Sequence, residues 1–350
     1  GQFINSVSRG GLNAELLTLA ENHGVKIIFN QRANSVDLKS NTVFLEDQLG
    51  RKSEVNSNLV FGSDGAYSAA RLQLQFTDRF NYSQTYLEHG YKELCIEPGE
   101  GGTFKIEKNA LHIWPRGGYM LIALPNLDGS FTCTLFFPHD GDPSFATLKD
   151  EASVMKFFNE VFPDAVPLMP NLVRDFFSNP TGSLMTVRCK PWTFENKLML
   201  IGDAAHAIVP FYGQGMNCAF EDCVELDQLL SEHSDLESAF AEFHVRRKPN
   251  ADAIADMAIE NYVEMRDSVA DDRFVLLKQL ERSLAGLHPE RFVPRYSMVM
   301  FRRIGYAEAQ RRGRVQWQIL EDLLGPATDL DGIDYAEAER RIHAELMPLA

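Results

Sequence analysis

The sequence has 350 residues, which is enough to bury a large core and to form two or three lobes. A formal net charge of −15 without a basic cluster argues against a polyanionic partner such as nucleic acid. The five cysteines lack the spacing of a zinc site and the histidines are scattered, so we predict that the protein has no metal site. The cysteines are predicted to be buried, reduced thiols. Since every apolar run is shorter than the roughly 20 residues that cross a bilayer, we expect no membrane contact.

The first 76 residues mix helical and strand-like patterns. Residues 12–20 carry Leu and Ala at helical spacing and predict a helix, and the apolar residues 25–29 predict a strand. Alternating segments bounded by turn residues at 35–38, 41–46 and 52–55 predict the strands of a small antiparallel excursion from the main sheet. The apolar run 59–62 then predicts a return to the main sheet.

An acidic residue and a glycine follow that run. Residues 64–71 read Asp-Gly-Ala-Tyr-Ser-Ala-Ala-Arg. Ser68 and Arg71 are about one helical turn apart on the same face, so both can meet a pyrophosphate above the strand ends. The alternative is a strand-to-helix turn with a capped helix, in which these residues have no ligand.

Aromatic, strand-like runs dominate the next hundred residues and predict a mixed sheet with hairpins. The strands are expected at 90–94, 103–106, 110–114, 119–124 and 131–137. An amphipathic helix is expected at 150–162, and prolines follow it. Residues 187–192 then return the chain to the first lobe.

A short apolar run, Leu198-Met-Leu-Ile201, predicts a strand buried on both faces. It stops at Gly202, and Asp203 follows at once. A carboxylate at the C-terminal end of a buried strand lies where open α/β sheets bind ligands. It can accept hydrogen bonds from sugar or ribityl hydroxyls.

A loop broken by Pro210 and Gly213 follows, and apolar spacing predicts a helix from near Gly215 to residue 230. The first amides of a helix are free and lie at the positive end of its dipole. We therefore expect them to favour negative charge in a bound ligand.

The remainder of the chain is predicted to be a helical cap over the active site. Helices are expected at 239–247, 252–269, 273–284 and 306–324. Pro249, Gly286, Pro289 and Pro294 are expected at the junctions between them.

As a set, these motifs resemble a known family. Gly202-Asp203, Pro210 and the run 213–217 resemble the second flavin fingerprint of the single-component FAD-dependent aromatic hydroxylases. The runs that begin at Leu111, Ala123, Glu260 and Arg295 are similar to those of the soluble bacterial kynurenine 3-monooxygenases. The resemblance begins near Ser6 and covers all but about the last fifty residues.

The resemblance implies an α/β fold with a Rossmann-like FAD-binding domain, a mixed β-sheet substrate domain and a C-terminal helical cap. The FAD-binding domain is expected in two parts, 1–76 and 187–248, with the substrate domain at 77–186 and the cap at 249–350. The family's N-terminal βαβ element with its Gly-x-Gly-x-x-Gly turn is missing from this numbering, so we expect an upstream stretch.

The activity implied is an NADPH- and O₂-dependent monooxygenase of tryptophan catabolism and pyridine nucleotide biosynthesis. It would convert L-kynurenine to 3-hydroxy-L-kynurenine through a C4a-hydroperoxyflavin, with FAD tightly bound and NADPH transient. Two alternatives stay open: an FAD-dependent hydroxylase or epoxidase of another aromatic or olefinic substrate, and a flavin-binding sensor without turnover. A cytoplasmic location is implied, and a homodimer is left open.

The resemblance also implies the site residues. Catalytic positions beside the flavin are Pro210, Phe211, Tyr212 and Gly213. Cofactor contacts are Arg9, Asp64, Arg71, Gly202, Asp203, Gly215, Met216 and Asn217. Substrate contacts are Leu111, Met120, Ile122, Leu124, Phe136, Asn261, Glu264 and Tyr296. His206 is expected to pack within its loop rather than to act as a base, and His112 and Trp114 are expected to be structural.

Overall fold

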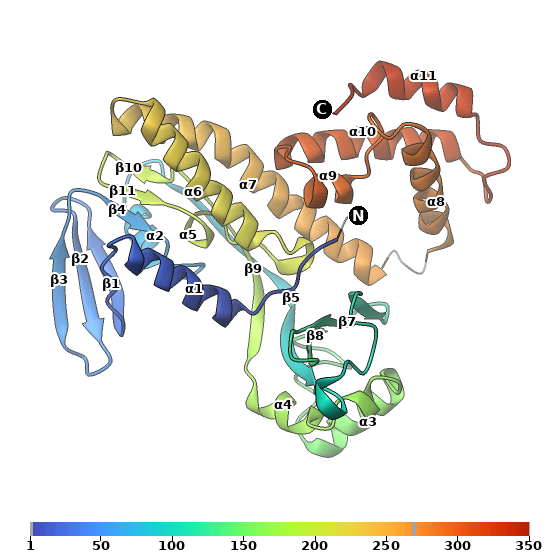
Figure 1. Ribbon diagram of the computed structural model, residues 1–350, viewed down its shortest axis with the longest axis horizontal. Helices are drawn as coiled ribbons and strands as arrows, with labels where there is room; N and C mark the ends of the chain where they lie inside the picture. Colours follow the sequence, from blue (N-terminus) through green and yellow to red (C-terminus); the bar gives the residue numbers. More distant parts are fainter. Residues whose placement is uncertain (1–2, 268–270, 350) are drawn as a thin grey trace. The chain divides into compact units, whose positions relative to one another are not determined.

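The computed structural model describes residues 3–267 and 271–349 (Figure 1). The chain divides into two compact units, and each is described by itself. The first unit contains Phe3–Gln31 and Thr85–Met185, and the second contains Arg32–Gln84 and the described chain from Thr186 onward. The four domain segments expected from the sequence stay a prediction.

Helix α1 (Arg9–Asn22) opens the first unit and confirms the helix expected at 12–20. Its N-cap is Ser8, whose hydroxyl accepts the amide of Gly11 at 3.2 Å. The prediction of a strand at 25–29 is wrong, because no described residue pairs with this segment. A strand is stabilised by a hydrogen-bonded neighbour. Without one, Val25, Ile28 and Phe29 are more than half exposed.

A five-stranded sheet has the order β6-β7-β8-β5-β9. Its strands are β5 (Asn81–Ile96), β6 (His112–Pro115), β7 (Met120–Pro125), β8 (Phe131–Pro138) and β9 (Thr181–Lys190). The pairs β6·β7, β7·β8 and β5·β8 are antiparallel. Four of the five strands expected in this region are therefore confirmed, although their bounds differ.

The strand expected at 103–106 is wrong. The residues before it form a 3₁₀ turn, η1 (Glu100–Gly102), in which Gly101 has a φ of 68°. The Thr103 hydroxyl donates to the carbonyl of Glu100 at 3.0 Å, which continues the turn. Phe104 and Ile106 pack against the core as an irregular segment. Their apolar pattern thus reports burial rather than strand pairing.

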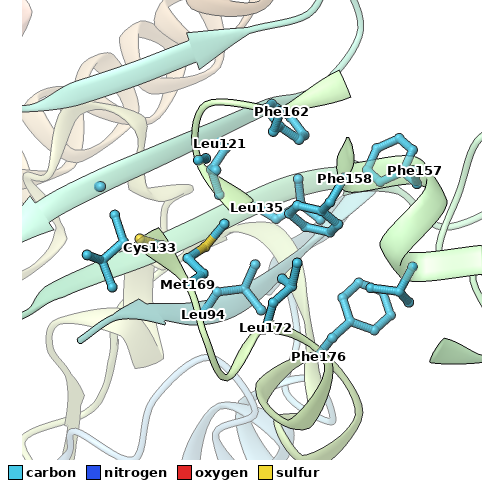
Figure 2. Packing of buried hydrophobic residues seen from close by; sticks show 14 of the residues in the cluster. Leu94, Leu121, Cys133, Leu135, Phe157, Phe158, Phe162, Met169, Leu172 and Phe176 are labelled. Carbon is cyan, nitrogen blue, oxygen red and sulfur yellow. The ribbon is translucent and has the colours of Figure 1, made fainter. Parts of the chain in front are cut away.

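One face of this sheet is covered by helices α3 (Glu151–Val161) and α4 (Leu172–Ser178). Figure 2 shows the shared core, in which Leu94, Leu121 and Leu135 of the sheet meet Phe158 and Phe176 of the helices. Helix α3 confirms the prediction at 150–162, and Asp150 caps it through the Ser153 amide at 2.8 Å. Helices α3 and α4 do not cover the opposite face of the sheet.

The second unit contains two small sheets. The antiparallel excursion expected from the sequence is confirmed as a three-stranded sheet of β1 (Gln31–Asp37), β2 (Thr42–Asp47) and β3 (Lys52–Asn56). The other sheet has the order β10-β11-β4, with β10 (Thr193–Phe194), β11 (Leu198–Leu200) and β4 (Val60–Gly62). Strands β4 and β11 run parallel, and all three residues of β11 are buried, as expected.

Two long helices follow, α6 (Gly215–Glu232) and α7 (Leu236–Asp267). The prediction of a helix junction at Pro249 is wrong, because α7 runs through it. Pro249 leaves the Val245 carbonyl without its helical donor, and in the same turn Asn250 Nδ2 adds a hydrogen bond to the Arg246 carbonyl at 2.8 Å. The helix end expected near Val269 lies outside the described residues.

The last helices are α8 (Asp272–Leu287), α9 (Arg295–Phe301), α10 (Tyr306–Leu324) and α11 (Tyr335–Glu345). The predicted bounds of α10 are confirmed. Buried Leu280, Phe292 and Leu320 belong to one apolar cluster that joins α8, α10 and α11. Within 3–267 and 271–349 there is no helix with the length and apolarity that a bilayer crossing requires.

Candidate active site

The parallel pairing of β4 and β11 brings the two acidic motifs to one sheet edge. Gly62 lies opposite Leu200, so Asp64 and Asp203 both follow the C-terminal ends of adjacent strands. A Cβ on Gly62 would lie 2.8 Å from the Ala70 Cβ and 2.9 Å from the Leu200 Cδ2. The close approach of strand and helix at this edge therefore requires glycine.

The carboxylate of Asp64 organises the turn after β4. It accepts hydrogen bonds from the Ser68 hydroxyl at 2.5 Å and from the amides of Ala69 and Ala70 at 2.7 and 3.1 Å. These amides begin helix α2 (Ala69–Leu74), which Ser68 also caps through the amide of Arg71 at 2.8 Å. Asp64 is thus a helix-capping residue that stays exposed to solvent.

The side chain of Arg71 turns inward and connects the two motifs. Its Nη1 donates to the Ala204 carbonyl at 2.8 Å and its Nη2 to the Ala66 carbonyl at 2.5 Å. The guanidinium also lies 5.0 Å from the ring centroid of Tyr82, and Arg71 is 3% exposed. The capped-turn alternative describes this geometry, and the expected contact of Arg71 with a pyrophosphate stays a prediction.

Asp203 has a different environment. It is the first residue of α5 (Asp203–His206), and it is exposed. Gly202 before it has a φ of 58°, which turns the chain sharply after β11. No described residue donates a hydrogen bond to the Asp203 carboxylate, so the carboxylate is available to a ligand hydroxyl.

A buried ionic network lies behind this turn. The fully buried carboxylate of Asp222 accepts hydrogen bonds from His206 Nε2 at 2.6 Å, Arg247 Nε at 2.8 Å and the Gly202 amide at 3.0 Å. Burial alone would lower the pKa of His206, but the hydrogen bonds and charge of Asp222 outweigh it and raise the pKa to about 10. His206 also packs on Trp192, with ring centroids 5.1 Å apart, so its expected packing role is confirmed.

The network was missed from the sequence. Asp222 and Arg247 are 25 residues apart, on α6 and α7, and neither belongs to a recognised motif. The available signal was an acid on the apolar face of α6. A carboxylate buried there requires a cationic partner, which the sequence did not identify.

Residues Pro210–Tyr212 form the short turn η3, and Gly213 follows with a φ of 65°. Asn261 of α7 donates from Nδ2 to the Phe211 carbonyl at 2.7 Å. The Phe211 ring stacks on Tyr262 with centroids 4.3 Å apart. Helix α7 therefore holds the loop by one hydrogen bond and one ring contact.

The next loop residues contact α9 and α10. The ring of Tyr212 stacks on Tyr296, with centroids 5.9 Å apart and planes 28° apart. The Oε1 of buried Gln214 accepts a hydrogen bond from the Tyr306 hydroxyl at 3.0 Å. The structure thus brings Phe211 and Tyr212 into contact with Asn261 and Tyr296, while the roles expected for these residues stay predictions.

Helix α6 begins at this loop without a side-chain cap. Gln214 occupies the N-cap position but makes no capping hydrogen bond, and Met216 and Asn217 are exposed. The first-turn amides are therefore open to an acceptor from a ligand. A side chain at Gly213 would enter open space, since nothing lies within 4 Å of its missing Cβ.

Glu264, expected to contact substrate, is engaged by a residue that was missed. Its Oε1 accepts a hydrogen bond from Arg295 Nη2 at 2.9 Å. Arg295 directly precedes Tyr296 in sequence, but no role was predicted for it. The negative charge of Glu264 is therefore paired with the positive charge of Arg295.

In the first unit, the expected apolar residues lie on the sheet face opposite α3 and α4. Met120 pairs with Phe136, and Ile122 and Leu124 follow Met120 at alternate positions of β7. Leu111, which precedes β6, is 39% exposed. Trp114 on the opposite face packs against the core of Figure 2, and His112 contacts Phe131 of that core, so their structural role is confirmed.

Arg9 also belongs to the first unit. Its Nη2 donates to Glu93 at 2.7 Å, and both side chains are largely exposed. An exposed ion pair of this kind contributes little stability. The contact of Arg9 with a flavin stays a prediction.

Comparison with known proteins agrees with this geometry. Residues 170–258 match the model of the FAD binding domain family. The chain is 49% identical over 349 residues to kynurenine 3-monooxygenase of Myxococcus xanthus, covering 99% of this chain and 75% of that protein. It is 48% identical over 346 residues to that of Stenotrophomonas maltophilia, covering 99% and 76%.

Two solved structures share the fold. The tetrameric form of 2-methyl-3-hydroxypyridine-5-carboxylic acid oxygenase is 23% identical with a TM-score of 0.59, covering 73% of this chain and 66% of that one. A point variant of Klebsiella pneumoniae HpxO, complexed with FAD, is 20% identical with a TM-score of 0.60, covering 81% and 72%.

The fold and the family match define an FAD-dependent flavoprotein monooxygenase. Within that class, the chain belongs to the kynurenine 3-monooxygenase family, and it spans about three quarters of the length of its relatives. The residues present fit the cofactor, because the free carboxylate of Asp203 and the uncapped start of α6 lie at the two ends of one loop.

Proposed function

We propose that the chain catalyses the NADPH- and O₂-dependent hydroxylation of L-kynurenine to 3-hydroxy-L-kynurenine. The observation that carries the proposal is 49% identity to a kynurenine 3-monooxygenase over 99% of this chain. When bound, FAD supplies the redox chemistry: it accepts a hydride from NADPH and activates O₂. The protein's share is to bind and orient the reactants and to exclude water.

Asp203 and the start of α6 are proposed to hold the FAD. The exposed Asp203 carboxylate would accept hydrogen bonds from ribityl hydroxyls. The amides of Gly215, Met216 and Asn217 would donate to the oxygen-bearing edge of the ring system, where negative charge develops on reduction. Nothing lies within 4 Å of the missing Cβ of Gly213, so this residue would leave room for the ring system.

Asp64 and Arg71 are proposed to contact the cofactor directly and also to support its site indirectly, by holding the turn at the sheet edge. Asp64 fixes the turn at the sheet edge, and Arg71 fixes that turn to the Ala204 carbonyl at 2.8 Å. Both residues thereby keep Gly202-Asp203 in register with the first motif. Their contact with the cofactor is supported by the family resemblance and by their position at the C-terminal strand ends.

Asn261 and Tyr296 are proposed to bind the carboxylate of the amino-acid substrate. The amide of Asn261 has two N–H donors. Its Nδ2 bonds to the Phe211 carbonyl at 2.7 Å and to the Met265 Sδ, a weak acceptor that a substrate carboxylate would replace, at 3.4 Å. Burial raises the pKa of Tyr296, which keeps its phenol protonated and able to donate. Glu264 is proposed to act through Arg295. In the first unit, the face with Leu111, Met120, Ile122, Leu124 and Phe136 is proposed to contact an aromatic ring.

The test uses the protein with FAD, NADPH and O₂, and follows product by mass spectrometry. L-kynurenine is compared with a phenolic acid. We expect one oxygen to be added to L-kynurenine, with a weaker reaction in Asn261→Ala and Tyr296→Phe. Val263→Ala is the matched control, since Val263 is 43% exposed on the same helix.

Other results would support the alternatives. Hydroxylation of the phenolic acid alone would indicate a different aromatic substrate. Consumption of NADPH without a product would indicate uncoupled oxidation, and binding of L-kynurenine without NADPH consumption would indicate a sensor. The cytoplasmic location and the homodimer stay proposals, to be tested by cell fractionation and light scattering.

A further inference from the structure

Arg295 is the centre of a charged cluster beside the Pro210–Tyr212 turn. From the first position of α9, its guanidinium donates to Glu260 and, at 2.9 Å, to Glu264. These two glutamates are one turn apart on α7, and the Arg295 side chain is 18% exposed. The planar guanidinium thus bridges α9 to two successive turns of α7.

The same guanidinium lies beside Tyr212. Its positive charge and a hydrogen bond stabilise the tyrosinate form, but burial dominates and raises the pKa of Tyr212 to about 12. The Tyr212 hydroxyl therefore stays protonated. Tyr296 follows Arg295 directly in α9, and its ring stacks on that of Tyr212, so Arg295 anchors the helix turn that carries one ring of the pair.

The stem of Arg295 runs across Gly313 of α10. A Cβ on Gly313 would lie 2.7 Å from the Arg295 Cδ and 3.0 Å from its Cγ. Glycine within a helix costs about 1 kcal/mol relative to alanine, so a buried glycine here has a packing reason. Gly313 forms a notch that admits the arginine stem between α10 and α7.

The charge of Arg295 is already matched. Two carboxylates accept its hydrogen bonds, and Glu264 has a second cation, Lys278, at 3.9 Å. A substrate carboxylate would therefore compete with two glutamates for this guanidinium. This balance argues against direct substrate binding by Arg295 and favours a role in holding its neighbours.

We propose that Arg295, seated in the Gly313 notch and held by Glu260 and Glu264, is a positioning residue that sets the Tyr212–Tyr296 ring pair at the loop before α6. The part that concerns L-kynurenine rests on the proposed function. The claim that Arg295 sets the Tyr212–Tyr296 ring pair, called the ring-pair part below, is argued from the contacts alone.

The key variant is Gly313→Ala, which leaves every site residue unchanged and displaces the Arg295 stem. Its matched control is Gly286→Ala, a helical glycine of α8 with nothing within 4 Å of its missing Cβ. In the FAD-loaded protein we expect Gly313→Ala and Arg295→Met to weaken L-kynurenine binding about 10- to 100-fold, measured by flavin fluorescence. We also expect more NADPH oxidised per product, a partial rescue in Arg295→Lys, and no change in Gly286→Ala.

Wild-type affinity and coupling in folded Gly313→Ala and Arg295→Met would overturn the proposal. If the wild-type protein does not hydroxylate L-kynurenine, the proposed function fails, and a double-mutant cycle tests the ring-pair part separately. Arg295→Met and Tyr212→Phe should shift the urea-unfolding midpoint non-additively. Additive shifts would overturn this part. Should Arg295→Met not fold, Gly313→Ala takes its place in the cycle.

Discussion

His206 and Asp222 form a hydrogen bond of 2.6 Å between side chains that are 6% and 0% exposed. The same carboxylate also holds Arg247 and the amide of Gly202, so one buried charge fixes the turn that precedes Asp203. Asp222→Asn removes the buried carboxylate that His206 and Arg247 share, and leaves Arg247 only its half-exposed carboxylate partner, Glu221. We expect it to lower the free energy of unfolding by about 3–5 kcal/mol, measured by urea unfolding.

The matched control is Glu221→Gln, which removes the other carboxylate partner of Arg247. Glu221 bonds to Arg247 at 2.9 Å, but its side chain is 48% exposed. A half-exposed pair contributes about 1 kcal/mol or less. Equal losses of unfolding free energy in the two variants would show that the burial of Asp222 does not make its interactions stronger than those of Glu221.

The raised pKa of His206 predicts a pH dependence of stability. Its pKa is about 10 in the folded chain against an ordinary 6.5, so the folded state binds the proton more tightly. This contribution is fully present below pH 6.5 and is lost as pH rises toward 10. The thiols of Cys133 and Cys189, whose pKa burial raises to about 12 from 9.0, add to the loss above pH 9.

The measurement is urea unfolding at intervals from pH 6 to 10. We expect the free energy of unfolding to fall across this range in the wild-type chain and much less in His206→Gln between pH 6.5 and 9. Parallel curves for the two proteins would mean that His206 is neutral in the folded state.

Asp203 and Arg71 should separate cofactor binding from stability. Asp203 is exposed and has no partner among the described residues, so Asp203→Asn should release FAD with a change in unfolding free energy within about 0.5 kcal/mol. Arg71→Met removes a buried guanidinium that bonds to Ala66 and Ala204, and should lower both stability and FAD content. FAD per chain and urea unfolding are measured on the same samples. Retention of FAD by Asp203→Asn would contradict the proposed ribityl contact.

Local patterns predicted the parts of the fold that short-range chemistry determines. The buried strand at Leu198–Leu200, the helix start at Gly215 and the bounds of α10 follow from apolar periodicity and chain-breaking residues. Both acidic motifs were predicted to follow strand ends, and the parallel pairing of β4 and β11 places those ends at one sheet edge.

Long-range pairing was not predictable in this way. Arg247 is 25 residues from Asp222, and Arg295 is 31 residues from Glu264, so no local pattern links them. The prediction of a helix break at Pro249 was wrong because packing can stabilise a helix even where one backbone donor is missing. The strand at 103–106 failed because apolar residues of an irregular segment can also face a core.

A further prediction concerns Gln316, which lies on the buried face of α10 one turn after Arg312. It is 2% exposed, and neither its Oε1 nor its Nε2 has a hydrogen-bond partner among the described residues. A buried amide without partners carries a desolvation penalty of about 1–3 kcal/mol. Gln316→Met has a similar volume and no such penalty, so we expect the free energy of unfolding to rise by about that amount. The control is Gln318→Met, because exposed Gln318 bonds to Asp322 at 2.9 Å and should change stability by no more than about 0.5 kcal/mol. A loss of stability in Gln316→Met would instead assign the amide an internal water as its partner.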